Sequence, residues 1–463
     1  MIQELKALFL FRPVIVLCLI QIGIASGFAR QTVANHVEKP AENKMAPDTL
    51  KLLRSLQKSE STVLEQARKG EAAVFDARLE PANRTVRAEF IEKLLAGDFE
   101  IPLSRHGFII TNALIHGPLN LRSAQVPVEA RFTECQFDDD VDFSSSQFSA
   151  PVVFDGSKFT NENARLNFNS MTVDGPLSFR HVEFAGKPEF YHLKIKSDLF
   201  ATDDIRFNNK DWVVAFDQSQ VGGKFFFQDA AFAGSLSLAD ITAKGLTLKS
   251  VTVQKGLDLR NAHIQTVIDL EITQPVGSIA LEGLTYGDLS GTGVGDQLRD
   301  LLDMAPFSAQ SYSQLDDYYR LHGYPEQAND VFIGMKKRER LILRQHLFLI
   351  PAYVASLVLD GVVGYGRAPQ RALYISICVV LLGSLVFRRN RDVVLQKPGE
   401  TSEIYSPLWY SLDLLTPFID LHAASVWMPR PDWRFGRNYA RIHRIIGWIL
   451  VPIGIAAITG IIK

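Results

Sequence analysis

Apolar residues recur in pairs of the form apolar-x-apolar through the centre of the chain, and successive pairs are mostly 11 residues apart. Successive side chains of a strand point to opposite faces, so a strand of three or four residues buries both members of such a pair on one face. A helix would need apolar positions at a period of 3.6 instead. The sixteen pairs are Phe108/Ile110, Leu119/Leu121, Ala130/Phe132, Val141/Phe143, Val152/Phe154, Leu166/Phe168, Leu177/Phe179, Pro188/Phe190, Ile205/Phe207, Val214/Phe216, Phe225/Phe227, Leu236/Leu238, Leu246/Leu248, Leu257/Leu259, Ile268/Leu270 and Ile279/Leu281.

A third apolar residue follows many of these pairs by five positions and adds an apolar corner to each short strand. Such a strand cannot bury its apolar face alone, but equivalent strands of successive turns can stack, pair their backbones and enclose a column of Phe and Leu. Eleven residues are too few to encircle a core, so two units form a coil of about 22 residues and the whole series forms about eight coils. Residues 101–292 are therefore predicted to be mainly β, a β-helix solenoid roughly 35–40 Å long at an inter-strand spacing of ~4.8 Å. Two breaks in the count predict loops of about three and six extra residues, between Phe159 and Leu166 and between Ile195 and Ile205.

Helical segments are predicted at both ends of the solenoid, where unpaired coils would otherwise associate edge to edge. Residues 59–100 have apolar positions at helical spacing and predict a helical cap, with Asn83 as the N-cap of its second helix. Residues 298–345 change to a 3.6 period and predict a helical hairpin that connects the solenoid to the rest of the chain. Gly323 suits the position after the first helix of this hairpin, and Pro325 suits the first turn of the second.

The repeats resemble those of pentapeptide-repeat and related right-handed β-helix proteins, here in a lengthened 11-residue form. The resemblance is carried by residues 107–121, which read GFIITNALIHGPLNL, and by residues 175–179, which read GPLSF. It extends to bacterial membrane proteins of this kind and covers nearly the whole chain. The resemblance implies a right-handed β-helix and implies no established activity.

The N-terminus has the features of an export signal. Residues 1–29 contain Lys6 and Arg12, then an apolar stretch from Pro13 to Ala25, then small residues before a cut after Ala29. An uncleaved anchor is the alternative, because a short apolar stretch can tilt or snorkel. Residues 30–58 are predicted to form a flexible lead-in because their first part is polar.

Residues 346–463 are predicted to form a membrane domain. Spans are expected near residues 372–387 and 445–462, with interfacial or re-entrant segments at 347–359 and 406–420. The loop between the spans is rich in arginine, which places it inside and the solenoid outside the cytoplasmic membrane, in the bacterial periplasm. The basic residues between 336 and 344 oppose this topology, and three spans with a cytoplasmic solenoid would satisfy both basic clusters.

Two segments were weighed as ion-conducting elements. Residues 362–366 (VVGYG) are similar to a potassium selectivity filter, but Arg367 follows them and they precede the better span, so a turn is favoured. Residues 410–420 are similar in placement to the pore segment of two-span channels, without its glycines. Asp413 and Asp420 lie seven residues apart and would share one side of a helix, either as pore acids or as structural partners of Arg430, Arg434 or Arg437.

The 463 residues carry a net charge of −2, which gives no global field for binding nucleic acid. No sequence motif of a catalytic, metal-binding or cofactor-binding site is found, and the cysteines Cys18, Cys135 and Cys378 are too scattered to predict a disulfide. The chain is therefore predicted to be no enzyme and to need no cofactor. Two functions remain: a membrane-anchored β-helix scaffold that binds envelope proteins or polymers or forms a homo-oligomer, and a pore-forming protein that its β-helix regulates.

Overall fold

The computed structural model describes residues 47–78, 80–273, 277–344, 349–389, 393–396, 404–416 and 418–461. The predicted signal peptide and residues 30–46 of the predicted lead-in lie outside these described residues.

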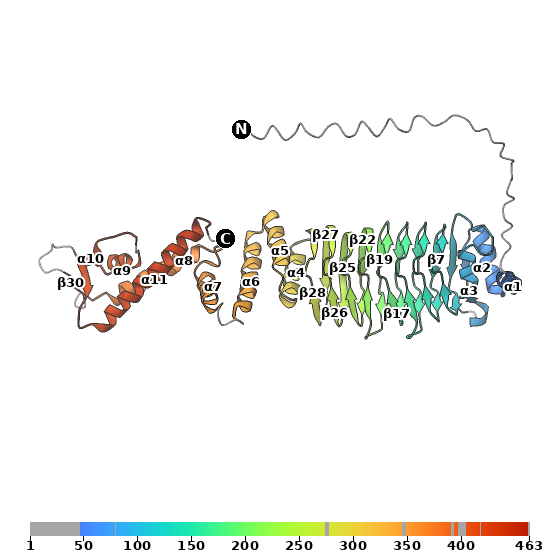
Figure 1. Cartoon of the computed structure of the whole chain (residues 1–463), viewed down its shortest axis with the longest axis horizontal. Coiled ribbons are helices and arrows are strands. Elements are labelled where there is room, and N and C mark those ends of the chain that lie inside the picture. The colour runs from blue at the N-terminus through green and yellow to red at the C-terminus, as the bar shows by residue number, and fades with distance from the viewer. Residues whose placement is uncertain are drawn as a thin grey trace, which may run out of the picture. The chain divides into compact units, whose positions relative to one another are not determined.

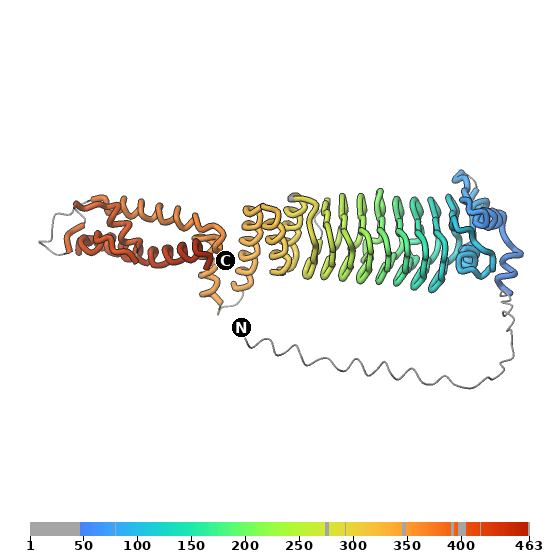
Figure 2. Tube along the Cα trace, turned by 90° about the horizontal axis from the view of Figure 1, so that it is seen from above, coloured from blue at the N-terminus to red at the C-terminus, as the bar shows by residue number. Residues whose placement is uncertain are grey.

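The centre of the chain is a parallel β-solenoid of about eight turns, as the repeat predicts (Figure 1). Strands of successive coils pair in parallel, and most paired residues are 22 apart, as in the series Phe108, Ala130 and Val152. Both views show the coils stacked one beside the next (Figure 2).

The strands form four rows along the solenoid, and the longest strands belong to more than one row. The first row contains β5 (Leu119–Asn120), β9 (Val141–Asp142), β13 (Arg165–Asn167), β17 (Lys187–Glu189), β21 (Val213–Ala215), β24 (Ser235–Ser237), β26 (Gly256–Asp258) and β28 (Ser278–Ala280). The second contains β6 (Gln125–Val126), β10 (Gln147–Phe148), β14 (Thr172–Val173), β18 (Lys194–Ile195), β22 (Gln220–Gln228), β25 (Thr242–Val253), β27 (His263–Ile272) and β29 (Thr285–Leu289). The third contains β1 (Ala73–Val74), β3 (Phe108–Thr111), β7 (Ala130–Thr133), β11 (Val152–Val153), β15 (Leu177–Ser178) and β19 (Leu199–Ala201), and continues into β22. The fourth contains β2 (Thr85–Arg87), β4 (Leu114–His116), β8 (Gln136–Phe137), β12 (Lys158–Phe159), β16 (Glu183–Phe184), β20 (Arg206–Phe207) and β23 (Ala231–Phe232), and continues into β25.

The interior is a column of stacked aromatic rings. Along the fourth row, the ring centroids of successive phenylalanines are 4.7, 4.8, 4.9 and 4.6 Å apart. This spacing matches the distance between neighbouring strands, so each coil places its ring on the ring of the coil before it. The members of the column are Phe137, Phe159, Phe184, Phe207 and Phe232.

The first predicted insertion is confirmed and the position of the second is wrong. Leu166 pairs with Val141, which is 25 residues earlier, so three extra residues lie before it. The second loop does not precede Ile205, because Leu199 pairs with Leu177 and continues the repeat without interruption. The extra residues lie later, at the adjacent left-handed positions Asp203 and Asp204 and between β20 and β21.

Helices cover the first coil of the solenoid. The helix α1 (Pro47–Arg54) occupies part of the segment that was predicted to be a flexible lead-in, and α2 (Lys58–Lys69) and α3 (Ala88–Leu95) follow. Asn83 is not the N-cap of α3, because it ends the short helix η1 (Pro81–Asn83) and β2 intervenes. The strand β2 pairs with β4, so the cap continues the sheet and also covers its end.

A buried ion pair fixes α2 to β2. Glu60 is fully buried and accepts hydrogen bonds from Arg87 Nε at 2.7 Å and from a terminal guanidinium nitrogen of Arg87 at 2.6 Å. Burial raises the pKa of Glu60, but the Arg87 hydrogen bonds and the Gln57 backbone N–H lower it by more, so the net pKa is below its ordinary value of 4.5. The pair therefore stabilises the cap only while Glu60 is ionised.

We expect Glu60→Gln to destabilise the cap by about 3 kcal/mol, at the low end for a broken buried pair because Arg87 stays partly hydrated. Since the folded pKa is lowered, this contribution is present above the unfolded pKa and is lost as the pH falls through the folded pKa. Hydrogen exchange of the α2 amides between about pH 3 and pH 7 measures the effect. The control Glu65→Gln, which breaks an exposed pair with Lys69, should change stability by less than about 0.5 kcal/mol. Equal effects of the two substitutions would contradict the assignment.

The predicted helical hairpin is present after the solenoid. It consists of α5 (Ala309–Leu321) and α6 (Pro325–Arg344), and Gly323 has the left-handed φ of +79° between them. The preceding helix α4 (Thr292–Met304) packs against the last strands, and Ser311 of α5 donates a hydrogen bond to the Leu281 carbonyl at 3.1 Å. Apolar side chains form one continuous core from the cap through the coils to this hairpin.

The C-terminal region is helical except for one antiparallel pair of short strands. The helices α8 and α11 pack side by side, and α9 packs against both (Figure 2). The elements are α7 (Ile350–Val363), α8 (Gln370–Val386), β30 (Val393–Leu395), α9 (Pro407–Leu415), α10 (Ala423–Val426), β31 (Trp427–Pro429) and α11 (Arg434–Ile458).

Candidate functional site

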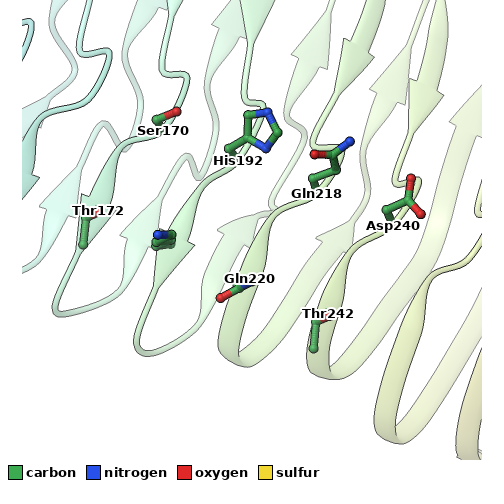
Figure 3. A pocket seen from close by; sticks show the side chains of 8 residues that line it. Ser170, Thr172, His192, Gln218, Gln220, Asp240 and Thr242 are labelled. Atoms are coloured by element: carbon green, nitrogen blue, oxygen red, sulfur yellow. The ribbon is translucent and has the colours of Figure 1, made fainter.

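A polar groove of about 480 Å³ crosses the outer surface of four neighbouring coils (Figure 3). Two rows of side chains line it, and each coil contributes one member to each row. The first row consists of Ser170, His192, Gln218 and Asp240, and the second consists of Thr172, Lys194, Gln220 and Thr242.

The repeat itself places these side chains. The residues of the first row have φ between 56° and 60°, so each coil turns a corner at this position in the left-handed region. The residues of the second row begin the next strand, and the pairings Thr172 with Lys194, Lys194 with Gln220 and Gln220 with Thr242 bring them side by side. The groove is therefore a ladder of polar groups at the inter-strand spacing of ~4.8 Å.

The side chains of this groove are largely without partners inside the chain. Among the described contacts, Asp240 accepts a hydrogen bond from Asn261 at 3.1 Å, and the other seven lining side chains make no side-chain hydrogen bond or ion pair. Elsewhere on the solenoid, outward polar groups are used within the fold, as Asp155 is by Ser178 and Asp217 is by Ser237, both at 2.5 Å. The groove thus presents free donors and acceptors.

The groove continues along the solenoid into a second section of about 800 Å³. Gly222 lies in its wall, where an added Cβ would come within 2.5 Å of the Lys196 carbonyl oxygen, so a side chain here would require the coil to shift. Lys196 forms an ion pair with Asp174 at 2.8 Å. Hydroxyl, amide, imidazole and ammonium groups predominate, and this mixture suits an extended ligand that offers both donors and acceptors.

Sequence analysis did not predict this groove. The residues of the first row directly follow or closely follow the inward pairs, and their polar character is ordinary for a turn. The available signal was the column formed by Ser170, His192, Gln218 and Asp240 when coils are aligned at their own spacing of 22 or 26 residues.

The C-terminal helices expose many large apolar side chains. By length and composition, α11 is the one described helix that is long and apolar enough to cross a membrane, and α7 and α8 are shorter apolar helices. Soluble monomers rarely expose apolar surface over several turns of neighbouring helices. The apolar and aromatic side chains exposed by more than 40% include Leu373, Tyr374, Ile377, Leu381 and Leu385 on α8 and Ile442, Ile445, Trp448, Ile449 and Ile455 on α11.

Small residues hold α8, α9 and α11 together. An added Cβ on Gly383 would collide with Ser411 Oγ and the His443 ring, and one on Gly447 would collide with the Leu415 carbonyl. Ser411 Oγ donates to the Val380 carbonyl at 2.9 Å, and His443 Nε2 donates to the Ser411 carbonyl at 3.0 Å. Close approach through small residues and hydrogen bonds between helices is typical of helix packing in lipid.

Asp413 and Asp420 do not share one side of a helix, because α9 ends at Leu415. The prediction failed because the chain turns back immediately after α9. The Asp413 carboxylate accepts hydrogen bonds from the backbone N–H groups of Leu421 at 2.9 Å and of Ala424 at 2.6 Å. Asp420 is exposed and accepts a hydrogen bond from the His422 N–H at 2.8 Å. Asp413 therefore closes the loop between α9 and α10.

We expect Asp413→Asn to lower the stability of this region by about 1–3 kcal/mol, because an amide NH₂ would face the N–H of Ala424. Asp420→Asn is the matched control and should have little effect, since its remaining oxygen still accepts from His422. Thermal unfolding in detergent measures both. The purified chain in liposomes should show no cation flux above empty vesicles, and a reproducible flux that Asp413→Asn abolishes would favour a pore.

The filter-like segment at residues 362–366 is a turn. The helix α7 ends at Val363, and the next three residues all have positive φ, with 53° at Tyr365. The Tyr365 hydroxyl contacts Ser356 Oγ at 2.7 Å, which fixes the turn against α7.

Part of the basic cluster at residues 336–344 is used inside the structure. Arg338 donates hydrogen bonds to the carbonyls of Leu302 and Ala305 at the end of α4. Arg340 forms an ion pair with Asp360 of α7 at 2.9 Å. Two of these positive charges are therefore neutralised or consumed within the fold, which weakens the argument for a cytoplasmic solenoid.

The described residues offer no evident catalytic chemistry. No group of three or more His, Cys, Asp or Glu side chains is found among them that could hold a metal ion. Cys135 and Cys378 are free thiols, and burial raises the pKa of Cys135 to about 12, so its reactive thiolate is suppressed.

Comparison of the chain with protein-family models, with curated proteins and with solved structures finds no significant match in any of the three. The resemblance to pentapeptide-repeat proteins and to pore segments therefore stays a prediction.

Proposed function

We propose that this chain is a membrane-anchored scaffold whose solenoid binds an extended partner along its polar groove. The observation that carries the proposal is the pairing of two surfaces in one chain: exposed apolar side chains on α8 and α11, and a groove of unpartnered polar groups on the solenoid. The apolar surface suits a lipid bilayer, and the polar ladder suits a linear partner.

The single apolar core supports a scaffold because it makes the cap, the coils and the hairpin one rigid body without a hinge in the described residues. A rigid ladder holds its binding groups in place before a partner arrives, so little conformational entropy is lost on binding. The geometry of Asp413 favours the scaffold over the pore, because its carboxylate is used by backbone donors.

Site-specific crosslinking in intact membranes tests the groove. A photoreactive residue in place of Gln218 should crosslink to a partner, whereas one in place of Asn208, an exposed turn residue after β20 in the fourth row, should not. The triple substitution of His192, Lys194 and Gln220 by alanine should remove the Gln218 crosslink, and a matched substitution of Lys158, Glu183 and Arg206 should preserve it. Equal crosslinking at both positions, or none at Gln218, would contradict the proposed binding face.

We also propose that the solenoid is right-handed with an 11-residue unit. Parallel strands joined by crossovers are right-handed in nearly all known cases, which supports the handedness. The 11-residue unit is supported by left-handed residues that recur at this interval, as at Asn112, Ser123, Glu134 and Ser145.

For orientation, we propose a cleaved signal peptide and a solenoid outside the cytoplasmic membrane of a bacterium. This topology places the arginine-rich segment between α8 and α11 inside. Alkaline phosphatase fused after residue 290 should be active, and a fluorescent protein fused there should be dark. The opposite pattern would place the solenoid in the cytoplasm.

A further inference from the structure

The surface at one end of α8 and α11 carries six exposed arginines with no acidic partner among the described residues. Four of them follow one face of α11 at intervals of three, four and three residues, which corresponds to a single stripe along the helix. The stripe consists of Arg434, Arg437, Arg441 and Arg444, and Arg388 and Arg389 follow the end of α8.

The two groups of arginines lie at the same end of the helix pair. Phe387, the residue before Arg388, contacts the ring of Tyr439 at 5.6 Å and that of Trp433 at 5.9 Å, and both rings lie within the arginine-bearing part of α11 or directly before it. At the opposite end, Gly454 of α11 lies next to Ala372 of α8, so the helices run antiparallel.

Nearby acids do not neutralise this surface. Asp413 is occupied by backbone N–H groups, Asp420 lies beside His422, and Asp432 lies 3.6 Å from Arg430. The positive end of the α11 dipole adds to the field of the first arginines.

The position of the stripe along α11 points to the ligand. The arginines end where the exposed apolar part of the helix begins, at Ile445, and the exposed rings of Trp409, Phe435 and Trp448 lie at this boundary. Aromatic rings favour the interface between hydrocarbon and headgroups, where the phosphates of lipids also lie. Guanidinium groups bind phosphate with paired hydrogen bonds.

We propose that this arginine surface, defined as Arg388, Arg389, Arg434, Arg437, Arg441 and Arg444, binds the phosphate headgroups of anionic phospholipids. The proposal rests on the proposed membrane anchoring and names the lipid class that the anchor recognises. The occupant is a bilayer lipid, because the arginine surface and the apolar belt below it are continuous along one helix.

Energy transfer from the chain's tryptophans to dansyl-labelled lipid tests the proposal in reconstituted vesicles of the full chain. We expect dansyl-phosphatidylglycerol to bind at least about tenfold more strongly than dansyl-phosphatidylcholine, with a preference that weakens as salt is raised. The fourfold variant R434Q/R437Q/R441Q/R444Q should remove the preference. The control K158Q/K210Q/K244Q/K249Q, which removes the same number of charges from the solenoid, should keep it.

The outcomes separate this proposal from the anchoring itself. Flotation with pure phosphatidylcholine vesicles tests anchoring alone and should be equal for the wild type and both variants. A chain that floats but shows no lipid preference, or loses it in both variants, overturns the anionic lipid site. A preference abolished by excess inorganic phosphate would assign the surface to free phosphate and would also overturn the proposal. A chain that does not float would overturn the anchoring and the lipid site together.

Discussion

Replacing Phe143 by aspartate is expected to abolish folding of the solenoid. The Phe143 ring is fully buried, stacks on Phe168 at 5.5 Å and meets the edge of Phe154 at 5.6 Å. An ionised carboxylate at this position has no partner in the apolar column and costs several kcal/mol, and the lost aromatic packing costs about 3–5 kcal/mol more. The sum approaches the roughly 5–15 kcal/mol by which domains are stable.

The control for this substitution is Asp139→Ser in a turn of the neighbouring coil. The Asp139 side chain accepts a hydrogen bond from the Asp140 N–H at 2.8 Å, and a serine hydroxyl can do the same. Circular dichroism and urea unfolding should give a native-like curve for Asp139→Ser and no cooperative transition for Phe143→Asp. A cooperative Phe143→Asp transition within about 1 kcal/mol of the wild type would overturn the assignment of the column.

Replacing Gly447 by valine is expected to separate α9 from α11. Gly447 is buried, and an added Cβ would overlap the carbonyl oxygen of Leu415, a backbone atom that cannot move without displacing α9. Overpacking costs about 1–3 kcal/mol when side chains can adjust and more when backbone must shift, so the loss should reach the upper end of this range.

Gly361 provides the matched control because it also lies within a helix, α7, and has no atom within 4 Å of an added Cβ. Gly361→Val should leave stability unchanged or raise it slightly, since valine favours helix more than glycine does. Thermal unfolding in detergent and trypsin cleavage of the segment around α9 compare the two variants. Equal stability of the two would contradict the packing of α9 on α11.

Sequence predicted the solenoid because its repeat is enforced by geometry. Each inward pair must meet its equivalent one coil later, so a single period is visible over most of the chain. The pair Leu199 and Ala201 was missed because alanine is small and Phe200, which points outward, obscured the alternation; Ala201 is nevertheless buried. Asn83 was misassigned because a strand residue, Val86, has the same apolar character as a helix residue.

The binding surfaces were less predictable than the fold because they depend on distances between coils and between helices. The groove arises when coils of unequal length bring Ser170, His192, Gln218 and Asp240 into one row. Asp413 was recognised from its apolar surroundings, but its partners are backbone groups of a returning loop, which no spacing rule indicates.

Extraction of membranes with alkaline carbonate tests the membrane-anchored scaffold most directly, because this treatment releases peripheral proteins and retains inserted ones. The account predicts that the full chain stays in the membrane pellet, since α8 and α11 expose apolar side chains along their length. A chain that ends at residue 344, which keeps the solenoid and the helical hairpin, should be released into the supernatant. Release of the full chain by carbonate would contradict the anchoring.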